Sequence, residues 1–97
     1  MPYFPAFIDL RGRTCVLVGA GPVGRRKLRR LIHCRADPLV VIEPYPSQRL
    51  LQDQTTTKSF TLHVRLFDPG DIQGAFLVVA STSSPEINAT IGRLCKK

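Results

Sequence analysis

Apolar residues gather in short runs along the chain, and these runs predict the strands of a sheet. Residues 39–42 form a continuous apolar run, and residues 74–80 form the most apolar run of the sequence. Together with a strand over residues 14–19, these runs are typical of parallel strands that are covered on both faces. Residues 60–67 instead alternate between apolar and polar positions, which predicts a half-buried strand nearer the edge of the sheet.

Helical patterns separate these runs. The first helix has arginines on one side and an apolar stripe on the other, which is expected to pack on the sheet and consists of Val23, Leu28, Leu31 and Ile32. A short second helix is predicted over residues 47–54, with Ser47 as its N-cap. A single helical turn is predicted around Ile72. The last helix has Pro85 in its first turn and an apolar face formed by Ile87, Ile91 and Leu94.

This order of elements predicts an α/β fold. Strands that alternate with helices are typical of a Rossmann-type, doubly wound parallel sheet with helices on both faces, and we expect about four strands in the order 3-2-1-4. The length of 97 residues suggests one domain over residues 1–97. Near the N-terminus, we expect Phe7, Ile8 and Leu10 to pack against the sheet.

A glycine turn between the first strand and the first helix predicts a dinucleotide site. Gly19, Gly21 and Gly24 follow the pattern G-x-G-x-x-G directly after an apolar strand. Gly19 permits a tight turn, Gly21 lets the backbone approach a pyrophosphate, and Gly24 lets the helix lie close to the sheet. Pro22 suits a first helical position, and the free N–H groups there face the anion. A glycine turn that binds no nucleotide is the alternative interpretation.

Polar residues after the second and fourth strands complete the predicted site. Glu43 lies 22 residues after Gly21, where NAD-binding folds place an acidic residue that accepts hydrogen bonds from the adenosine ribose. A glutamate here favours NAD over NADP because it repels a 2′-phosphate. An exposed loop glutamate is the alternative. Residues 81–86 supply small polar groups where the carboxyl end of a strand meets a ligand.

The composition bears on possible partners. Fourteen Lys and Arg against seven Asp and Glu give a net charge of +7, and six of the basic residues crowd residues 25–35. Arg25 and Arg26 are unfavourable in a first helical turn, which is easier to understand if an anion binds there. Because this basic run lacks interleaved aromatic residues, nucleic acid is not an expected partner.

Cysteine usage and hydropathy suggest a cytoplasmic protein. Cys15, Cys34 and Cys95 are odd in number and widely spaced, which predicts buried or half-buried reduced thiols and neither disulfides nor a metal site. His33 and His63 are expected on the surface. No secretory signal is visible, and no stretch approaches the ~20 apolar residues of a membrane span. No membrane partner is therefore expected.

Several motifs together resemble one family. The chain opens with Phe4-Pro5-Ala6-Phe7-Ile8-Asp9-Leu10, and the fourth predicted strand leaves through an apolar run that ends at Thr82. Three further matches are Arg26-Lys27, Phe67-Asp68-Pro69 and Asn88. This combination resembles the N-terminal dehydrogenase domain of sirohaem synthases, also known as precorrin-2 dehydrogenases, and the likeness covers nearly the whole chain.

The resemblance implies a cofactor, a substrate and an assembly. Members of this family oxidise precorrin-2 to sirohydrochlorin with NAD as hydride acceptor in sirohaem biosynthesis, and some also insert ferrous iron. By position, the backbone at Pro22 and Val23 is implied to contact the pyrophosphate of NAD. Glu43 and Pro44 are implied to border the adenosine, and Thr82 to lie near the nicotinamide. A homodimer is implied for the intact protein.

The chain also departs from the family pattern. Gly24 stands where many members have alanine, a change expected to be harmless for the turn, and Ser83 and Ser84 replace a common acidic pair. Family members continue into a fifth strand, Asn-Val-x-Asp, whose aspartate is their proposed acid/base residue, and that position lies beyond Lys97. The catalytic residue is therefore unknown, and catalysis by these residues alone is expected to be incomplete. A non-catalytic NAD-binding or NAD-sensing module is the alternative function.

Overall fold

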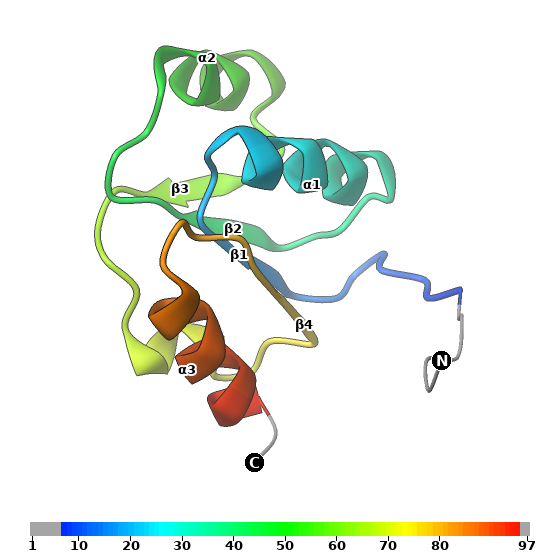
Figure 1. Ribbon diagram of the computed structural model, residues 1–97. Coiled ribbons are helices and arrows are strands. Elements are labelled where there is room, and N and C mark those ends of the chain that lie inside the picture. Colours follow the sequence, from blue (N-terminus) through cyan, green and yellow to red (C-terminus); the bar gives the residue numbers. More distant parts are fainter. Residues whose placement is uncertain (1–6, 96–97) are drawn as a thin grey trace.

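A parallel sheet of four strands lies at the centre of the computed structural model, which describes residues 7–95 (Figure 1). Residues 4–6 of the opening motif lie outside the described residues. The strands stand side by side in the order β3-β2-β1-β4, and all three neighbouring pairs are parallel. Their bounds are Cys15–Val18 for β1, Leu39–Ile42 for β2, Thr61–His63 for β3 and Leu77–Ala80 for β4. The predicted α/β class and strand order are confirmed.

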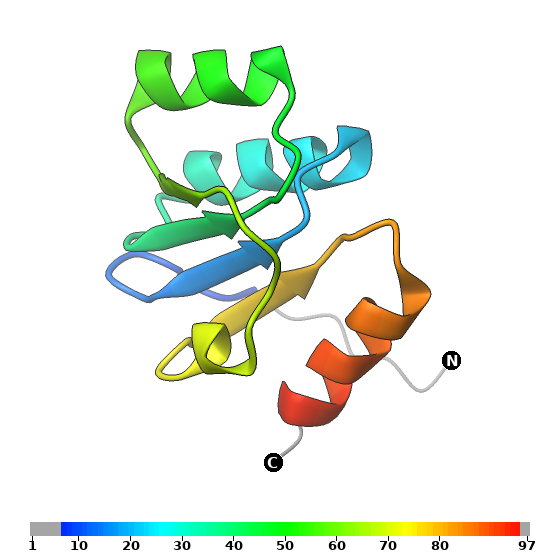
Figure 2. The ribbon, with the colours of Figure 1, turned by 90° about the vertical axis from the view of Figure 1, so that its left-hand side faces the viewer.

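Helices cover both faces of the sheet (Figure 2). The helices α1 (Pro22–His33) and α2 (Gln48–Thr57) lie on one face. The helix α3 (Pro85–Cys95) and the short 3₁₀ helix η1 (Pro69–Ile72) lie on the other. The Ser47 side chain accepts a hydrogen bond from the N–H of Leu50, so the predicted N-cap of α2 is confirmed.

The sheet separates two apolar clusters, as a doubly wound fold requires. Alternate residues of β1 serve opposite faces: Cys15 and Leu17 pack under α1 and α2, and Val16 and Val18 pack toward α3. All four residues are fully buried. On the first face they meet Leu28, Leu31 and Leu50, and on the second they meet Ile42 and Ile91. Burial on both faces of the sheet therefore explains the continuous apolar runs in the sequence.

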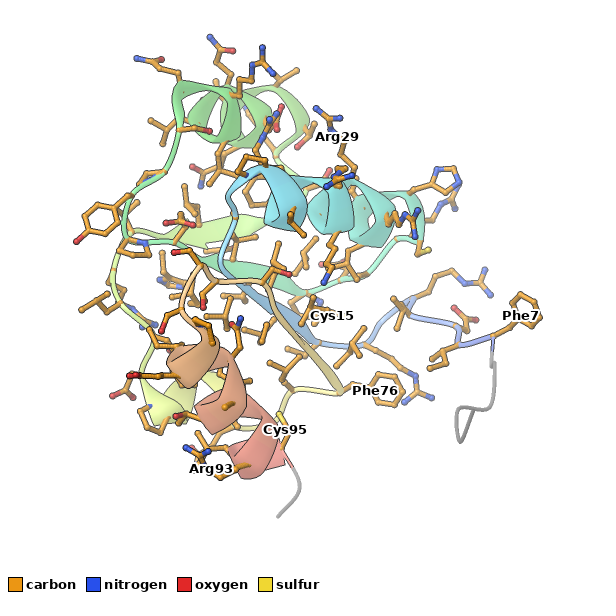
Figure 3. All side chains as sticks on the ribbon, viewed as in Figure 1. Phe7, Cys15, Arg29, Phe76, Arg93 and Cys95 are labelled. Carbon is orange, nitrogen blue, oxygen red and sulfur yellow. The ribbon has the colours of Figure 1, made fainter. Side chains whose placement is uncertain are left out.

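Some predicted apolar contacts are wrong. Val23 is 51% exposed, because the rotation of α1 turns Gly24, Leu28 and Leu31 inward. At the N-terminus, Leu10 is buried but Phe7 and Ile8 are exposed, and Phe7 points away from the body of the molecule (Figure 3).

The strand predicted over residues 60–67 ends much earlier, at His63. The last bond of the ladder runs from the N–H of Glu43 to the carbonyl oxygen of His63, and the N–H of Arg65 turns back to that same oxygen, so the strand stops there. Val64 and Leu66 are consequently exposed. The helix α2 instead runs three residues further than predicted, to Thr57, and its C-cap Lys58 adopts a left-handed conformation with φ 51°.

Two of the cysteines differ from expectation. Cys15 is buried within β1, where desolvation raises the pKa of its thiol (Figure 3). Cys34 and Cys95 are exposed, because they follow or end helices at the surface. All three thiols are free. His33 and His63 are exposed, as predicted.

The strand β4 forms one border of the sheet. Within residues 7–95, it pairs with β1 and with no other strand. All four of its residues are only partly buried, although this is the most apolar run of the chain. At its start, the Arg13 guanidinium lies 4.2 Å from the centre of the exposed Phe76 ring. An apolar strand thus presents a free edge.

Candidate functional site

A pocket of about 230 Å³ opens at the carboxyl ends of the strands. The loops that follow β1, β2 and β4 all contribute to it, together with the segment after β3. Five of the predicted site residues line it, namely Gly19, Gly21, Glu43, Pro44 and Thr82. Pro22 and Val23 are exposed in the first turn of α1, and Gly24 is buried behind the turn. Ligands of doubly wound folds bind in this position.

The glycine turn is packed too closely for side chains at two positions. Gly19 has a φ of +92°, and a Cβ there would come within 2.6 Å of the backbone of Ser81 and Thr82. A Cβ on Gly24 would come within 2.2 Å of the carbonyl oxygen of Gly19. This close approach agrees with the expectation that Gly24 lets the helix lie near the sheet, and the helix or the turn would have to move to accept alanine here.

Gly21 has a different environment. A Cβ at this position would meet no atom within 4 Å, and its φ of −71° suits any residue. Gly21 is the N-cap of α1, yet no side chain caps this helix and its first turn has no acidic residue. The start of α1 therefore offers N–H groups beside open space, which fits the pyrophosphate of a dinucleotide.

Glu43 joins the end of β2 to the glycine turn. Its Oε1 accepts a hydrogen bond from the N–H of Ala20 at 2.7 Å, and its Oε2 accepts one from the N–H of Tyr45 at 2.9 Å. The side chain is half-buried and lines the pocket. Each carboxylate oxygen can accept a further hydrogen bond, so Glu43 can still accept hydrogen bonds from hydroxyl groups.

The loop after β4 is held by a residue that sequence reasoning did not assign to the site. The Oδ1 of Asn88 accepts hydrogen bonds from the N–H of Thr82 at 3.2 Å and from its hydroxyl at 2.7 Å. The Nδ2 of Asn88 donates to the carbonyl oxygen of Thr82 at 3.1 Å. The only signal in the sequence was that Asn88 follows the strand exit in the family motif.

Within residues 7–95, two buried polar side-chain atoms near the turn have no hydrogen-bond partner. One is the Oγ of Ser81, a residue that lines the pocket. Together with the uncapped start of α1, this hydroxyl gives the pocket unsatisfied groups that fit a polar ligand. The other is the Nε of Arg25, whose Nη2 pairs with Asp53 of α2 at 3.2 Å. Arg25 thus binds α2, contrary to the expectation that it serves an anion at the helix start.

Two aspartates, Asp9 and Asp71, form ion pairs away from the pocket. Asp9 pairs with Arg11, whose guanidinium lowers the pKa of that carboxyl group to about 2. Hydrogen bonds from Arg65 likewise lower the pKa of Asp71, which also accepts the N–H of Asp68 at the start of η1. Among residues 7–95, Glu43 is the one carboxylate that lines the pocket, and no three His, Cys, Asp or Glu side chains form a metal cluster.

The sequence matches known proteins over nearly its whole length. Residues 6–97 match a protein family described as "Putative NAD(P)-binding". The siroheme synthase of Nitrosomonas europaea is 29% identical over 97 residues, which are 100% of this chain and 20% of that protein. The siroheme synthase of Photobacterium profundum is 36% identical over 92 residues, which are 94% of this chain and 19% of that protein. The chain therefore spans about a fifth of these relatives.

A solved structure, "SirC, precorrin-2 dehydrogenase", has the same fold with a TM-score of 0.81 and 18% sequence identity. The likeness covers 93% of this chain and 44% of that one. Among residues 7–95, none of the helices is both long and apolar enough to pass through a membrane. Family match, relatives and fold agree with the cofactor class that the glycine turn predicts. The chain belongs to this NAD(P)-binding family, and it is similar in sequence to one part of the siroheme synthases.

Proposed function

We propose that this chain binds NAD and acts as the cofactor domain of a precorrin-2 dehydrogenase in sirohaem biosynthesis. The observation that carries the proposal is that one pocket is lined by the glycine turn, by Glu43 and by Thr82. These three features come from different strands, and each has a counterpart in a dinucleotide. The siroheme synthases and the precorrin-2 dehydrogenase that the chain resembles support the pathway.

The order of the strands suggests how NAD would lie. Glu43 follows β2, so the adenosine ribose would donate its hydroxyl hydrogen bonds there, beside Pro44. The pyrophosphate would sit at the start of α1, against the backbone of Pro22 and Val23 and beside Gly21. The nicotinamide would then extend past β1 toward Thr82 after β4. Glu43 would disfavour the 2′-phosphate of NADP.

NAD supplies the hydride acceptor for the oxidation of a tetrapyrrole such as precorrin-2. The residues of this chain would bind and orient the cofactor through the glycine turn and the loop after β4. The oxidation also releases a proton, which calls for a base. In the described part of the chain, Asp9, Asp68 and Asp71 lie outside the pocket lining and Glu43 is bonded to two backbone N–H groups. We therefore assign cofactor binding, and not proton removal, to these residues.

The same observation favours a second function, an NAD-sensing module without catalysis. Precorrin-2 oxidation separates the two. A cofactor domain that lacks its base should oxidise precorrin-2 only in traces until the remainder of the enzyme is supplied, and a sensing module should never do so. Turnover by the 97 residues alone at the rate of an intact family member would contradict our assignment of the proton step.

Calorimetric titration with NAD tests the site itself. We expect binding by the wild type and a loss of at least about tenfold in affinity for Gly21→Asp, because the new carboxylate meets the pyrophosphate. Gly21→Asn is the matched control, since it has nearly the same size without the charge. Aspartate and asparagine are both favourable N-caps, so neither substitution should unfold α1.

Two results would contradict the proposal. The absence of binding by the wild type at millimolar NAD would exclude the function. Equal affinities of the wild type and Gly21→Asp would show that NAD binds away from the start of α1. A loss in Gly21→Asp that greatly exceeds the loss in Gly21→Asn would support an anion at this position.

A further inference from the structure

The side chain of Asn88 holds Thr82 by its backbone on both sides. A backbone N–H can only donate and a carbonyl oxygen can only accept, so the two contacts fix the orientation of the amide. Oδ1 faces the N–H of Thr82, and Nδ2 faces its carbonyl oxygen. Because Asn88 lies in the first half of α3, the rigid helix holds the loop that follows β4.

The hydrogen bonds of the Thr82 hydroxyl determine what it can still do. Two acceptors lie near its Oγ1, namely Asn88 Oδ1 at 2.7 Å and the carbonyl oxygen of Ser84 at 3.0 Å. The single hydroxyl proton must go to one of them. The N–H of Ser84 donates to Oγ1 from 3.2 Å and occupies one of its two lone pairs. The second lone pair is left, so Thr82 can accept a further hydrogen bond but cannot donate one.

Thr82 lies on the side of the pocket where the second half of a dinucleotide belongs. Glu43 follows β2 and Thr82 follows β4, and β1 with its glycine turn stands between these strands. A dinucleotide with its adenosine ribose at Glu43 and its pyrophosphate at the turn therefore brings its other ring to Thr82. The polar group on that ring must suit an acceptor.

We propose that Thr82 Oγ1 selects a ring that bears a carboxamide, and that Asn88 is the positioning residue that holds this oxygen in place through the backbone of Thr82. This inference rests on the proposed function. The NH₂ group of a nicotinamide can donate to Oγ1. The carboxylate of a nicotinic acid ring has no proton to donate, so it would face a lone pair and lose its hydration without compensation.

Three ligands test the proposal on the 97-residue chain: NAD, nicotinic acid adenine dinucleotide, and ADP-ribose, which lacks the ring. We expect the wild type to bind NAD about tenfold more tightly than the nicotinic acid analogue. Thr82→Val should lose this preference and bind ADP-ribose as the wild type does. Thr90→Val is the matched control, because the Thr90 hydroxyl bonds only within α3, to the carbonyl oxygen of Glu86 and to Arg93.

A second pair of variants separates positioning from stability. Thr82→Ser keeps the hydroxyl and should keep the preference. Asn88→Ala leaves the hydroxyl proton its acceptor at Ser84 but removes the bonds that hold the Thr82 backbone. The Oγ1 atom should then lose its position, and the ratio of the two dissociation constants should fall at least threefold. If Asn88 had a purely structural role, its loss would lower the affinities for all three ligands alike. The ratio of the two dissociation constants would then stay unchanged, and this result would overturn the positioning role.

The ligand series also separates this inference from the proposed function. If ADP-ribose binds but the wild type does not distinguish NAD from the nicotinic acid analogue, the role of Thr82 is wrong and the dinucleotide site stands. If none of the three ligands binds, both fail. A preference that is present in the wild type and Thr90→Val but lost in Thr82→Val supports the selection of a carboxamide.

Discussion

Replacement of Gly24 by alanine should destabilise the fold, although alanine is the better helix former. The Cβ of alanine would lie 2.2 Å from the carbonyl oxygen of Gly19 and 2.9 Å from its carbonyl carbon. Both atoms belong to the backbone of the glycine turn, so no side-chain rotation relieves the contact. Either α1 or the turn must move by roughly 1 Å to restore an ordinary van der Waals distance.

Two opposed contributions determine how far Gly24→Ala changes the free energy of unfolding. Alanine favours a helix over glycine by about 0.8–1 kcal/mol. Overpacking of a close contact costs about 1–3 kcal/mol. Gly92 provides the control, because it lies in the same kind of element, α3, and a Cβ there would meet no atom within 4 Å. Gly92→Ala should gain only the stability that comes from the higher helix propensity of alanine. The difference between the free energies of unfolding of the two variants therefore measures the steric cost at Gly24.

Urea unfolding followed by circular dichroism measures this difference. We expect Gly92→Ala to unfold at a higher urea concentration than the wild type, and Gly24→Ala to be less stable than Gly92→Ala by about 1–3 kcal/mol. NAD affinity should fall in Gly24→Ala alone, since the displaced backbone belongs to the pocket. Equal stabilisation by the two substitutions would refute the reasoning and show that the turn yields without cost.

Three further predictions concern charge and the sheet edge. Glu43→Gln should reduce the discrimination of NAD against NADP by about tenfold in calorimetry, because the like charge is removed; unchanged discrimination would place the 2′-phosphate elsewhere. Asp71→Asn should cost about 1 kcal/mol at pH 7. Because Arg65 lowers the pKa of Asp71, this loss should be complete above about pH 4 and vanish as the pH falls further; a pH-independent difference in urea unfolding would exclude the ion pair as its cause. The free edge of β4 should pair with another strand, from a second copy or another segment. Sedimentation that shows a monomer at high concentration, with rapid amide exchange over Leu77–Ala80, would contradict this.

The fold could be predicted because its signals are local. Continuous apolar runs identified β1 and β2, and a serine before an amphipathic segment identified the start of α2. The errors concern contacts between distant segments. The end of β3 depends on where its backbone turns away from β2, and the exposure of Val23 depends on the rotation of α1 over the sheet. Neither is encoded in the period of a single segment.

Residues of the candidate site could be predicted from local patterns, but the contacts between them could not. Spacing from the glycine turn identified Glu43, and the exit of an apolar strand identified Thr82, and both line the pocket. The bond between Glu43 and Ala20 joins residues 23 positions apart, and it leaves no periodic trace in the sequence. The sequence motif predicted a close approach at Gly24, but not which atoms would meet a methyl group there, because only the folded turn brings the backbone of Gly19 near.

The bond from Ala20 to Glu43 has a consequence for the thermodynamics of recognition. It holds the turn against the end of β2 before any ligand arrives, so the two subsites are already ordered and binding spends little entropy on arranging them. In the proposed binding mode, this bond would also couple the two halves of a dinucleotide. A substitution of Glu43 should lower the affinity even for inorganic pyrophosphate, which has no ribose. The glycine turn that would bind pyrophosphate would lose its hydrogen bond to Glu43.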